Sequence, residues 1–407
     1  MSKSTFVIVG ASLAGAKAAE ELRSQGFDGR VVLLGAESER PYERPPLTKD
    51  YLRGESEREK AYVHAAAFYA EHEIELELAT AVSEIDPAAG RVTLGDGRAV
   101  EFDRLLLATG AEPRRIAVDG AALDGVYYLR TLADCDLLRE RLDEGGHVAV
   151  VGAGWIGSEF AASARQRGLD ATVVDPLALP NERIFGAEIG AFYRDVHISH
   201  GVEMVLGEGV EALVGETEVK AVRTSSGREI ACDFVVVAIG VAPRVALAQA
   251  AGLGVDNGIL VSDALQTSAP TVFAAGDVAN AAHPFYGERI RVEHWANALN
   301  QGPAAARSML GQATSYDRIP YFYSDQYDVG MEYSGYAPKW DEIVFRGERD
   351  SGEFIAFWLK DQRVIAGMNV NVWDVNDQVQ ALIRTRKPIQ TAALSDPDTP
   401  LESLINA

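Results

Sequence analysis

The sequence contains one local pattern twice, and this repetition limits the folds open to the chain more than any other feature. In residues 6–34 and again in residues 147–175, an apolar run leads into a glycine-rich turn, a helical pattern and a second apolar run. Short apolar runs that alternate with helical segments predict buried parallel strands joined by helices. We therefore expect two related α/β units, each built as strand, turn, helix and strand.

The turns of both units have the residues that a dinucleotide-binding turn requires. Apart from one serine they follow the spacing GxGxxG, with Gly10, Ser12 and Gly15 in the first turn and Gly152, Gly154 and Gly157 in the second. Such a turn lets a pyrophosphate approach the backbone at a helix N-terminus. Ser12 is small, and its hydroxyl can itself donate to a phosphate. The alternative is that the glycines serve only tight packing of helix on strand.

A carboxylate follows the second strand of each unit. Asp175 stands 23 positions beyond Gly152, where it would accept hydrogen bonds from an adenosine ribose and repel a 2'-phosphate. This carboxylate favours NADH over NADPH. Arg183 is close enough in sequence to bind a 2'-phosphate, which would favour NADPH. Glu37 is the expected ribose ligand in the first unit.

The repetition continues downstream and indicates the domain boundaries. Residues 105–114 and 235–244 each have an apolar run that ends at a glycine, with a proline three residues later. Each reads as a buried strand at the end of a crossover. A third such run, at residues 271–277, ends in Gly276-Asp277 and has no counterpart in the second unit.

The simplest arrangement is one domain made of residues 1–112 and 245–316, interrupted by a second domain at residues 113–244. Residues 317–407 mix short apolar strands with a helical stretch near residues 374–384. They are expected to form a smaller α+β domain.

Composition excludes several functions. With a formal charge of -22, the chain does not suit a nucleic acid or an anionic membrane as partner. Its two cysteines, Cys135 and Cys232, are far apart, which disfavours dithiol redox chemistry. The same count excludes a zinc site or an iron–sulfur cluster built from four thiolates, and no metal site is expected. Neither a signal peptide nor an apolar run long enough to span a bilayer is found, so a soluble cytoplasmic protein is expected.

Six segments together resemble the FAD-dependent NADH:ferredoxin reductases, the family that includes putidaredoxin, rhodocoxin and biphenyl dioxygenase reductases. These segments are residues 10–15, 44–49 (RPPLTK), 108–110, 152–157, 276–277 and 324–327 (SDQY). The resemblance covers essentially the whole chain. It implies a glutathione-reductase-like fold, with FAD in the discontinuous first domain and NADH in the second. It also implies hydride transfer from NADH to FAD and single-electron transfer to a [2Fe-2S] ferredoxin that serves a cytochrome P450 or a Rieske oxygenase.

The resemblance assigns the site residues. Those for FAD are Gly10, Ser12, Ala14, Gly15, Ala36, Glu37, Arg44, Lys49, Val82, Ala108, Thr109, Gly110, Arg130, Gly276, Asp277, Glu293, His294 and Trp295. Those for the nicotinamide cofactor are Gly152, Gly154, Ile156, Gly157, Glu159, Asp175, Arg183 and Gly240. Two departures from the family pattern are Ser12 and residues 321–323 (YFY), where relatives often carry tryptophan.

Lys49 and Glu159 are the expected catalytic residues. Pro45 and Pro46 restrict the backbone just before Lys49 and would hold its charge near the flavin. We expect Lys49 to pair with Glu159 when the two nucleotide domains meet. The alternatives are a solvated loop lysine and a glutamate that merely suits the helix dipole. Likewise, Asp277 could be a helix cap and Trp295 a core residue.

A flavoprotein without a dithiol must discharge its electrons to an external acceptor. The alternatives are an NADH oxidase or peroxidase, a rubredoxin or monodehydroascorbate reductase, and a redox-sensing protein like apoptosis-inducing factor, whose basic surface is the opposite of the charge found here. A basic patch for ferredoxin is conceivable at Arg289, Arg291, Arg307 and Lys339, against scattered surface charge. His197 and His200 are expected to be surface residues rather than metal ligands.

Overall fold

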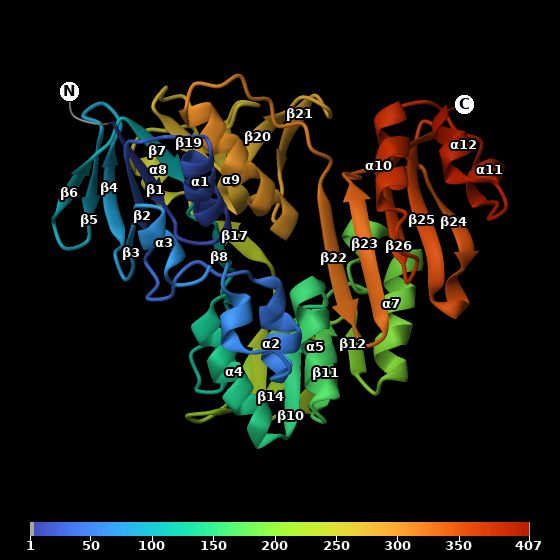
Figure 1. Ribbon diagram of the computed structural model, residues 1–407. Coiled ribbons are helices and arrows are strands. Elements are labelled where there is room, and N and C mark those ends of the chain that lie inside the picture. Colours follow the sequence, from blue (N-terminus) through green and yellow to red (C-terminus); the bar gives the residue numbers. More distant parts are fainter. Residues whose placement is uncertain (1–3, 407) are drawn as a thin grey trace. The chain divides into compact units, whose positions relative to one another are not determined.

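The computed structural model describes residues 4–406, and the chain divides into two compact units. Unit 1 comprises residues up to 45, residues 57–112 and residues 241–318, and unit 2 comprises residues 46–56, 113–240 and 319 onwards. Figure 1 shows the elements of both units and labels those for which there is room. The assignment of one nucleotide to each predicted domain stays a prediction. The described residues include no helix with the length and apolar character needed to cross a membrane.

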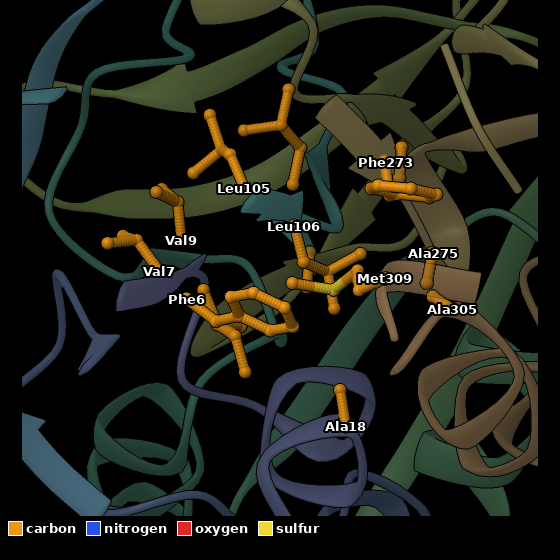
Figure 2. Packing of buried hydrophobic residues seen from close by; sticks show 14 of the residues in the cluster. Phe6, Val7, Val9, Ala18, Leu105, Leu106, Phe273, Ala275, Ala305 and Met309 are labelled. Carbon is orange, nitrogen blue, oxygen red and sulfur yellow. The ribbon is translucent and has the colours of Figure 1, made fainter. Parts of the chain in front are cut away.

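Unit 1 is built on a five-stranded parallel sheet with the order β19-β7-β1-β2-β3. Its strands are β1 (Thr5–Val9), β2 (Arg30–Leu34), β3 (Ile74–Glu77), β7 (Arg104–Leu107) and β19 (Val272–Ala274). The strands are apolar at consecutive positions because both faces of the sheet are covered. Figure 2 shows side chains of β1 and β7 packed together with Ala18 and Met309 from the covering helices.

The helices and small sheets of unit 1 surround this sheet. Helices α1 (Leu13–Ser24) and α9 (Trp295–Met309) lie side by side (Figure 1), and a Cβ on Gly302 would come within 2.3 Å of the carbonyl oxygen of Ala14. Glycine at position 302 therefore permits the close approach of the two helices. The remaining elements are η2 (Arg58–Ala61), α3 (Phe68–Glu71), β4 (Val82–Asp86), β5 (Arg91–Leu94), β6 (Ala99–Glu101), α8 (Ala246–Ala250), β18 (Ile259–Val261), η3 (Gly276–Val278), β20 (Ala279–His283) and β21 (Glu288–Arg291). Strands β8 (Ala111–Pro113) and β17 (Val241–Pro243) form a two-stranded ladder.

Unit 2 repeats the parallel architecture in its first part. Its sheet has the order β12-β11-β10-β16-β9, formed by β9 (Val126–Tyr127), β10 (His147–Val151), β11 (Asp170–Asp175), β12 (Glu203–Leu206) and β16 (Phe234–Val237). The helices of this part are η1 (Pro45–Thr48), α2 (Asp50–Arg53), α4 (Leu132–Glu144), α5 (Trp155–Gln166), α6 (Glu182–Phe185) and α7 (Ala187–Ser199). A small antiparallel sheet contains β13 (Val210–Gly215), β14 (Val219–Thr224) and β15 (Glu229–Ala231).

The last part of unit 2 is an antiparallel sheet with the order β22-β23-β26-β25-β24. Its elements are β22 (Tyr321–Gln326), β23 (Val329–Gly335), β24 (Glu342–Glu348), η4 (Arg349–Ser351), β25 (Glu353–Lys360) and β26 (Arg363–Val370), followed by α10 (Asn376–Thr385), α11 (Thr391–Ser395) and α12 (Leu401–Asn406). Phe185 and Tyr193 belong to the same hydrophobic cluster as Trp358 of β25. This shared core explains why the C-terminal sheet is grouped with α6 and α7.

The expectation for His197 is wrong. His197 is fully buried near the end of α7, and its ring contacts Gln326 of β22. The sequence near His197 contains Ser199 and His200, both exposed, and so has the polarity of a surface helix end. The strand that covers His197 comes from a distant part of the chain, which a local pattern does not reveal.

Candidate functional site

The glycine turn of unit 1 connects β1 to α1 through a backbone that only glycine adopts easily. Gly10 has φ +120°, and a Cβ there would lie 2.1 Å from the carbonyl oxygen of Ala108. A Cβ on Gly15 would lie 2.0 Å from the carbonyl oxygen of Gly10. These glycines are thus required by close packing of the turn, which supports the packing interpretation for these two positions.

Ser12 lies between Gly10 and Gly15 in the turn and is partly buried. It is the N-cap of α1, but in the described structure its side chain accepts no hydrogen bond from the first helical turn. The first N–H groups of a helix have no partner within the helix. The start of α1 therefore presents uncapped donors and a hydroxyl, the donor set that a pyrophosphate needs.

The predicted ribose ligand of unit 1 is held by a tyrosine. The Tyr42 hydroxyl donates to Glu37 Oε2 at 2.5 Å, and Arg44 Nη2 lies 3.8 Å from Glu37 Oε1. Tyr42 itself is buried, and the Arg44 guanidinium lies 5.4 Å from its ring centroid. Glu37 and Arg44 are thus brought together, although they come from two different predicted motifs.

The start of α9 contains the last of the predicted flavin residues in sequence order, His294 and Trp295. Burial lowers the pKa of His294, the N-cap of α9, to about 4, and Asp277 opposes this shift. Burial also raises the pKa of Glu43, and the nearby Trp295 opposes this shift. Glu43 was not predicted from the sequence.

Three further predicted flavin residues belong to unit 1. Gly276 has φ +80°, its N–H donates to Gln301 Oε1 at 2.9 Å, and a Cβ on it would come within 3.2 Å of the Ala14 Cβ. The Thr109 hydroxyl donates to the carbonyl of Arg244 at 2.9 Å. Gly110 has φ +66°. The loops after β7 and β19 are therefore shaped by glycines at their ends, as is usual at the carboxyl edge of a parallel sheet.

The remaining flavin assignments are spread over both units. Ala36 is exposed, Val82 is partly buried at the start of β4, and Glu293 forms an ion pair of 2.5 Å with Arg291. Arg130 and Lys49 belong to unit 2.

The glycine turn of unit 2 repeats that of unit 1, with one informative difference. A Cβ on Gly152 would lie 2.3 Å from the Ala238 carbonyl oxygen, and one on Gly157 would lie 2.0 Å from the Gly152 carbonyl oxygen. No atom of the described residues comes within 4 Å of a Cβ placed on Gly154, whose φ is -78°. Packing within the protein does not require glycine at position 154. The open space at the N-terminus of α5 is compatible with a dinucleotide pyrophosphate.

Asp175 at the end of β11 is fixed by the glycine turn. Its carboxylate accepts the Ala153 N–H at 2.7 Å and the Leu177 N–H at 2.8 Å. Each carboxylate oxygen keeps a further lone pair for a ribose hydroxyl. Arg183 in α6 and Gly240 are both exposed, and Ile156 is partly buried in the first turn of α5.

The RPPLTK segment and the residues after it form two short helical turns, although its prolines also suit a stiffened loop. We call residues 45–53 the plug. Pro45 starts η1, and Lys49 follows as the N-cap of α2. Proline suits the first turn of a helix because its missing N–H would have no partner there. The plug is fixed by hydrogen bonds from Ser163 to the Thr48 carbonyl at 2.6 Å and from Arg167 to the Arg53 carbonyl at 2.7 Å.

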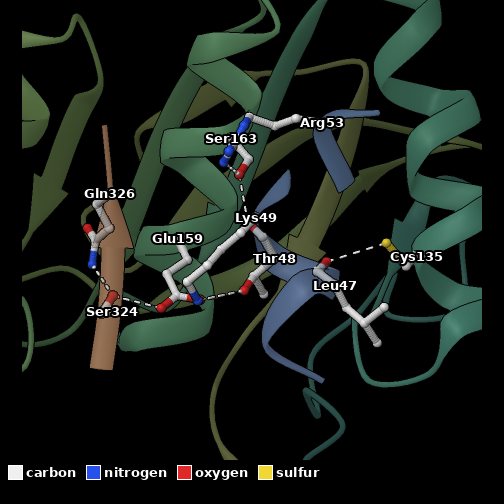
Figure 3. Close-up of polar contacts among 9 residues, drawn as sticks. All are labelled: Leu47, Thr48, Lys49, Arg53, Cys135, Glu159, Ser163, Ser324 and Gln326. Atoms are coloured by element: carbon white, nitrogen blue, oxygen red, sulfur yellow. Dashed lines mark hydrogen bonds and ion pairs between the residues drawn. The ribbon is translucent and has the colours of Figure 1, made fainter. Parts of the chain in front are cut away.

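Lys49 and Glu159 form the expected ion pair, with 2.6 Å between Nζ and Oε2 (Figure 3). Their side chains are 11% and 8% exposed, so neither is a solvated surface charge. The pair lies within unit 2, because the plug and α5 both belong to it. Glu159 is the fifth residue of α5, beyond the first turn, so the helix dipole alone does not account for its place.

Other groups complete the environment of this pair. The Thr48 hydroxyl donates to Glu159 Oε2, and the Ser324 hydroxyl donates to Oε1 at 2.7 Å. Lys49 Nζ lies 5.6 Å from the ring centroid of Tyr323. Burial raises the pKa of Asp325, and the charge of Lys49 opposes the shift. The SDQY segment thus contributes directly to the surroundings of the predicted catalytic residues.

The arginines proposed for a basic patch are engaged within the protein. Arg289 donates to the carbonyls of Val261 and Asn280, at 2.7 and 3.0 Å. Arg307 pairs with Glu21 at 2.7 Å, and Arg291 pairs with Glu293. These contacts favour the interpretation as scattered surface charge.

Sequence reasoning missed the residues that support the ion pair. Thr48, Ser324 and Gln326 lie inside the quoted RPPLTK and SDQY segments but were given no role, and His197 was assigned to the surface. The alternation of Ser324 and Gln326 along a strand was the available signal, because residues two apart face the same side.

Comparison with known proteins agrees with this geometry. The family described as pyridine nucleotide-disulphide oxidoreductase matches residues 4–302, and the reductase C-terminal family matches residues 321–405. Rhodocoxin reductase of Rhodococcus erythropolis is 38% identical over 98% of this chain and 94% of its own length. The ferredoxin–NAD(+) reductase component of the anthranilate 1,2-dioxygenase system of Burkholderia cepacia is 38% identical over 100% of both chains.

A solved structure extends the similarity to three dimensions. The crystal structure of the covalent putidaredoxin reductase–putidaredoxin complex matches with a TM-score of 0.95 and 35% identity, covering 100% of this chain and 99% of that chain. The two cysteines here are buried and form no disulphide, so the disulphide of the family name has no counterpart in the described residues. The chain belongs to the pyridine nucleotide-disulphide oxidoreductase family, in agreement with its resemblance to the NADH:ferredoxin reductases.

Proposed function

We propose that this protein oxidises NADH and passes the electrons, through bound FAD, singly to a [2Fe-2S] ferredoxin that serves a cytochrome P450 or a Rieske oxygenase. One observation carries the proposal. The chain has two glycine turns with the spacing of dinucleotide-binding turns, but its two cysteines are both buried and form no disulphide with each other. Electrons that enter the protein therefore have to leave to a separate carrier. The full-length similarity to ferredoxin reductases of dioxygenase and cytochrome systems supports ferredoxin as that carrier.

The cofactors are FAD and NADH. Bound FAD supplies the conversion of a two-electron hydride transfer into single-electron steps. The chain supplies binding and orientation. The start of α1, with Ser12 and Glu37, is assigned to FAD, and the start of α5, with Gly154 and Asp175, is assigned to NADH.

We assign Lys49 and Glu159 to the orientation of the reacting end of bound NADH. Glu159 is on the same helix whose N-terminus is assigned to the pyrophosphate, and Lys49 is tied to it within the same unit. A buried ion pair is costly to desolvate and often adds little stability, so its presence beside the assigned NADH site supports a role in the reaction.

We propose a cytoplasmic location for the reaction, because the hydride donor NADH is supplied there.

Anaerobic titration of the yellow protein with NADH tests the proposal. We expect one equivalent of NADH to bleach the flavin, and cytochrome c reduction to accelerate strongly when a [2Fe-2S] ferredoxin is added. Cytochrome c reduction that no member of a ferredoxin panel accelerates, together with rapid oxygen consumption, would instead identify an NADH oxidase. Acceleration by rubredoxin alone would identify a rubredoxin reductase.

A further inference from the structure

A buried polar chain leads from the end of α7 to the carboxylate of Glu159. Its members are Tyr327, His197, Gln326 and Ser324, and it ends on Glu159 Oε1. The successive distances are 3.3 Å from the Tyr327 hydroxyl to His197 Nδ1, 2.9 Å from His197 Nε2 to Gln326 Oε1, 3.1 Å from Gln326 Nε2 to Ser324 Oγ, and 2.7 Å from Ser324 Oγ to Glu159 Oε1. Figure 3 shows the last part of this chain.

The chemistry of the groups gives the chain a single direction. The carbonyl oxygen of Gln326 can only accept, so His197 donates from Nε2 and keeps Nδ1 as an acceptor for the Tyr327 hydroxyl. The Gln326 amide then donates to Ser324. Because the oxygen of Ser324 already accepts this bond, its one proton is directed at Glu159. Every donor therefore points towards the carboxylate.

The inner members of the chain are inaccessible to solvent. His197 is 0% exposed, and Ser324 and Gln326 are each 1% exposed. Replacement of buried polar groups by apolar residues of similar volume often leaves the stability of a protein unchanged. A polar chain in which every hydrogen bond is made instead rigidifies the group at its end. Neutral donors also hold the carboxylate without adding a second charge to the Lys49 pair.

We propose that His197, Gln326 and Ser324 are positioning residues that fix the Glu159 carboxylate, and with it Lys49, for the oxidation of NADH. This inference rests on the proposed function. The decisive member is His197. Without a donor at Nε2, the Gln326 amide is free to turn its oxygen towards Ser324, which would then donate to Gln326 instead of Glu159. A change 127 residues away from Ser324 in sequence would thus remove the bond to Glu159. This hydrogen-bonded chain orients the Glu159 carboxylate. It does not conduct protons, because the Gln326 amide could pass a proton on only through an imidic acid.

The test compares Ser324→Ala, His197→Phe and the double variant, by the rate of anaerobic flavin bleaching at saturating NADH. Loss of one hydrogen bond to a charged group corresponds to a rate about tenfold or more lower, and we expect this for each single variant. If both changes remove the same bond, the double variant is no slower than either single one. Ser324→Thr, which keeps the hydroxyl, should retain close to the native rate. Ser199→Ala, on the exposed side of the same helix as His197, should stay within about twofold.

Rates that multiply in the double variant, or a His197→Phe protein that bleaches at the native rate, would overturn the proposal. Should His197→Phe not fold, Gln326→Met interrupts the same chain at its next member and replaces it in the cycle.

A second readout does not depend on turnover. NMR of protein labelled with ¹⁵N-histidine reports which ring nitrogen of His197 carries the proton. We expect protonation at Nε2 in the native protein and in Ser324→Ala, and loss of this preference in Gln326→Met. Protonation at Nδ1 in the native protein would mean that Nε2 cannot donate to Gln326. The hydrogen bonds would then not all point towards Glu159, and the proposal would be refuted. If NADH fails to bleach the flavin of the native protein, the proposed function is wrong, while the NMR result still decides the direction of the chain.

Discussion

Lys49 and Glu159 place opposite charges 2.6 Å apart where both side chains are nearly inaccessible to solvent. Removal of one member leaves the other charge buried, which costs about 3–5 kcal/mol in comparable pairs. We therefore expect Lys49→Met to lower the free energy of unfolding by about 3 kcal/mol. The double variant Lys49→Met/Glu159→Gln, which buries no charge, should recover most of that loss. Denaturant unfolding of the FAD-loaded protein measures both values.

The rate of flavin bleaching by NADH separates stability from function in the same variants. If the pair orients NADH, the double variant remains slow although its stability has returned. A double variant that is both stable and fast would show that neither stability nor the reaction with NADH needs the pair.

Asp175 is the residue at which the preference for NADH can be tested. Asp175→Asn keeps an oxygen that can accept the Ala153 N–H, but removes the charge that would repel a 2'-phosphate. We expect the ratio of kcat/KM for NADH to that for NADPH to fall by about tenfold or more, the value of one hydrogen bond to a charged group. Asp170→Asn, on the same strand and exposed, is the matched control. An unchanged ratio would remove Asp175 from the ribose site.

Among individual residues, the sequence predicted those whose role depends on neighbours in the chain. Lys49 follows two prolines, Asp175 follows a strand, and the glycines have a fixed spacing, so each is recognisable locally. Ser324 and His197 act through contacts that span 165 and 129 residues, and nothing in their own neighbourhood reveals those partners. A polar residue within a polar segment looks exposed until the strand that covers it is known.

At the scale of elements, the two glycine turns allow packing and ligand binding to be separated. Gly152→Ala would force a Cβ to 2.3 Å from the Ala238 carbonyl at a φ of +110°, so we expect a protein that is strongly destabilised or does not fold. Gly154→Ala has space for its methyl group and an ordinary φ, so we expect the native melting temperature. Its dissociation constant for NAD+ should nevertheless rise about tenfold or more, a loss of about 1.4 kcal/mol.

Calorimetry of unfolding and titration with NAD+ measure the two effects independently. Native affinity in Gly154→Ala would mean that no ligand approaches the turn at this residue.

The strands and helices of the parallel sheets agree closely with the sequence pattern. The helical pattern expected within residues 147–175 is found at Trp155–Gln166, and in the C-terminal part the helical stretch expected near residues 374–384 is found at Asn376–Thr385. The RPPLTK segment differed because two adjacent prolines are compatible both with an extended loop and with the start of a helix. Contacts with α4 and α5, such as the bond from Tyr51 to Asp136 at 2.6 Å, favour the helix.

At the scale of the whole molecule, buried histidines predict sensitivity to acid. Burial lowers the pKa of His197 to about 4, against about 6.5 in an unfolded chain. The hydrogen bond with Gln326 opposes this shift, and the neighbouring His200 reinforces it. Between these values the unfolded chain binds a proton that the folded protein does not, so the free energy of unfolding falls as the pH falls. The slope from His197 is at most about 1.4 kcal/mol per pH unit.

Denaturant unfolding at several values between pH 7 and pH 4 checks this expectation. His197→Phe is expected to reduce the slope in that window, whatever its effect on stability at neutral pH. A slope equal to that of the native protein would show that His197 does not remain neutral in the folded state.

The chain passes between the two units five times, at residues 45/46, 56/57, 112/113, 240/241 and 318/319. A fragment cut at 113–240 would look like a complete nucleotide module, with the glycine turn and Asp175 intact. It would nevertheless lack the plug with Thr48 and Lys49 and the strand with Ser324, and so every side-chain donor described for Glu159. Recombination of such modules between related reductases would therefore transfer the binding of NADH without the groups that orient it. We expect an exchange of activity only when all three segments of unit 2 are transferred at once.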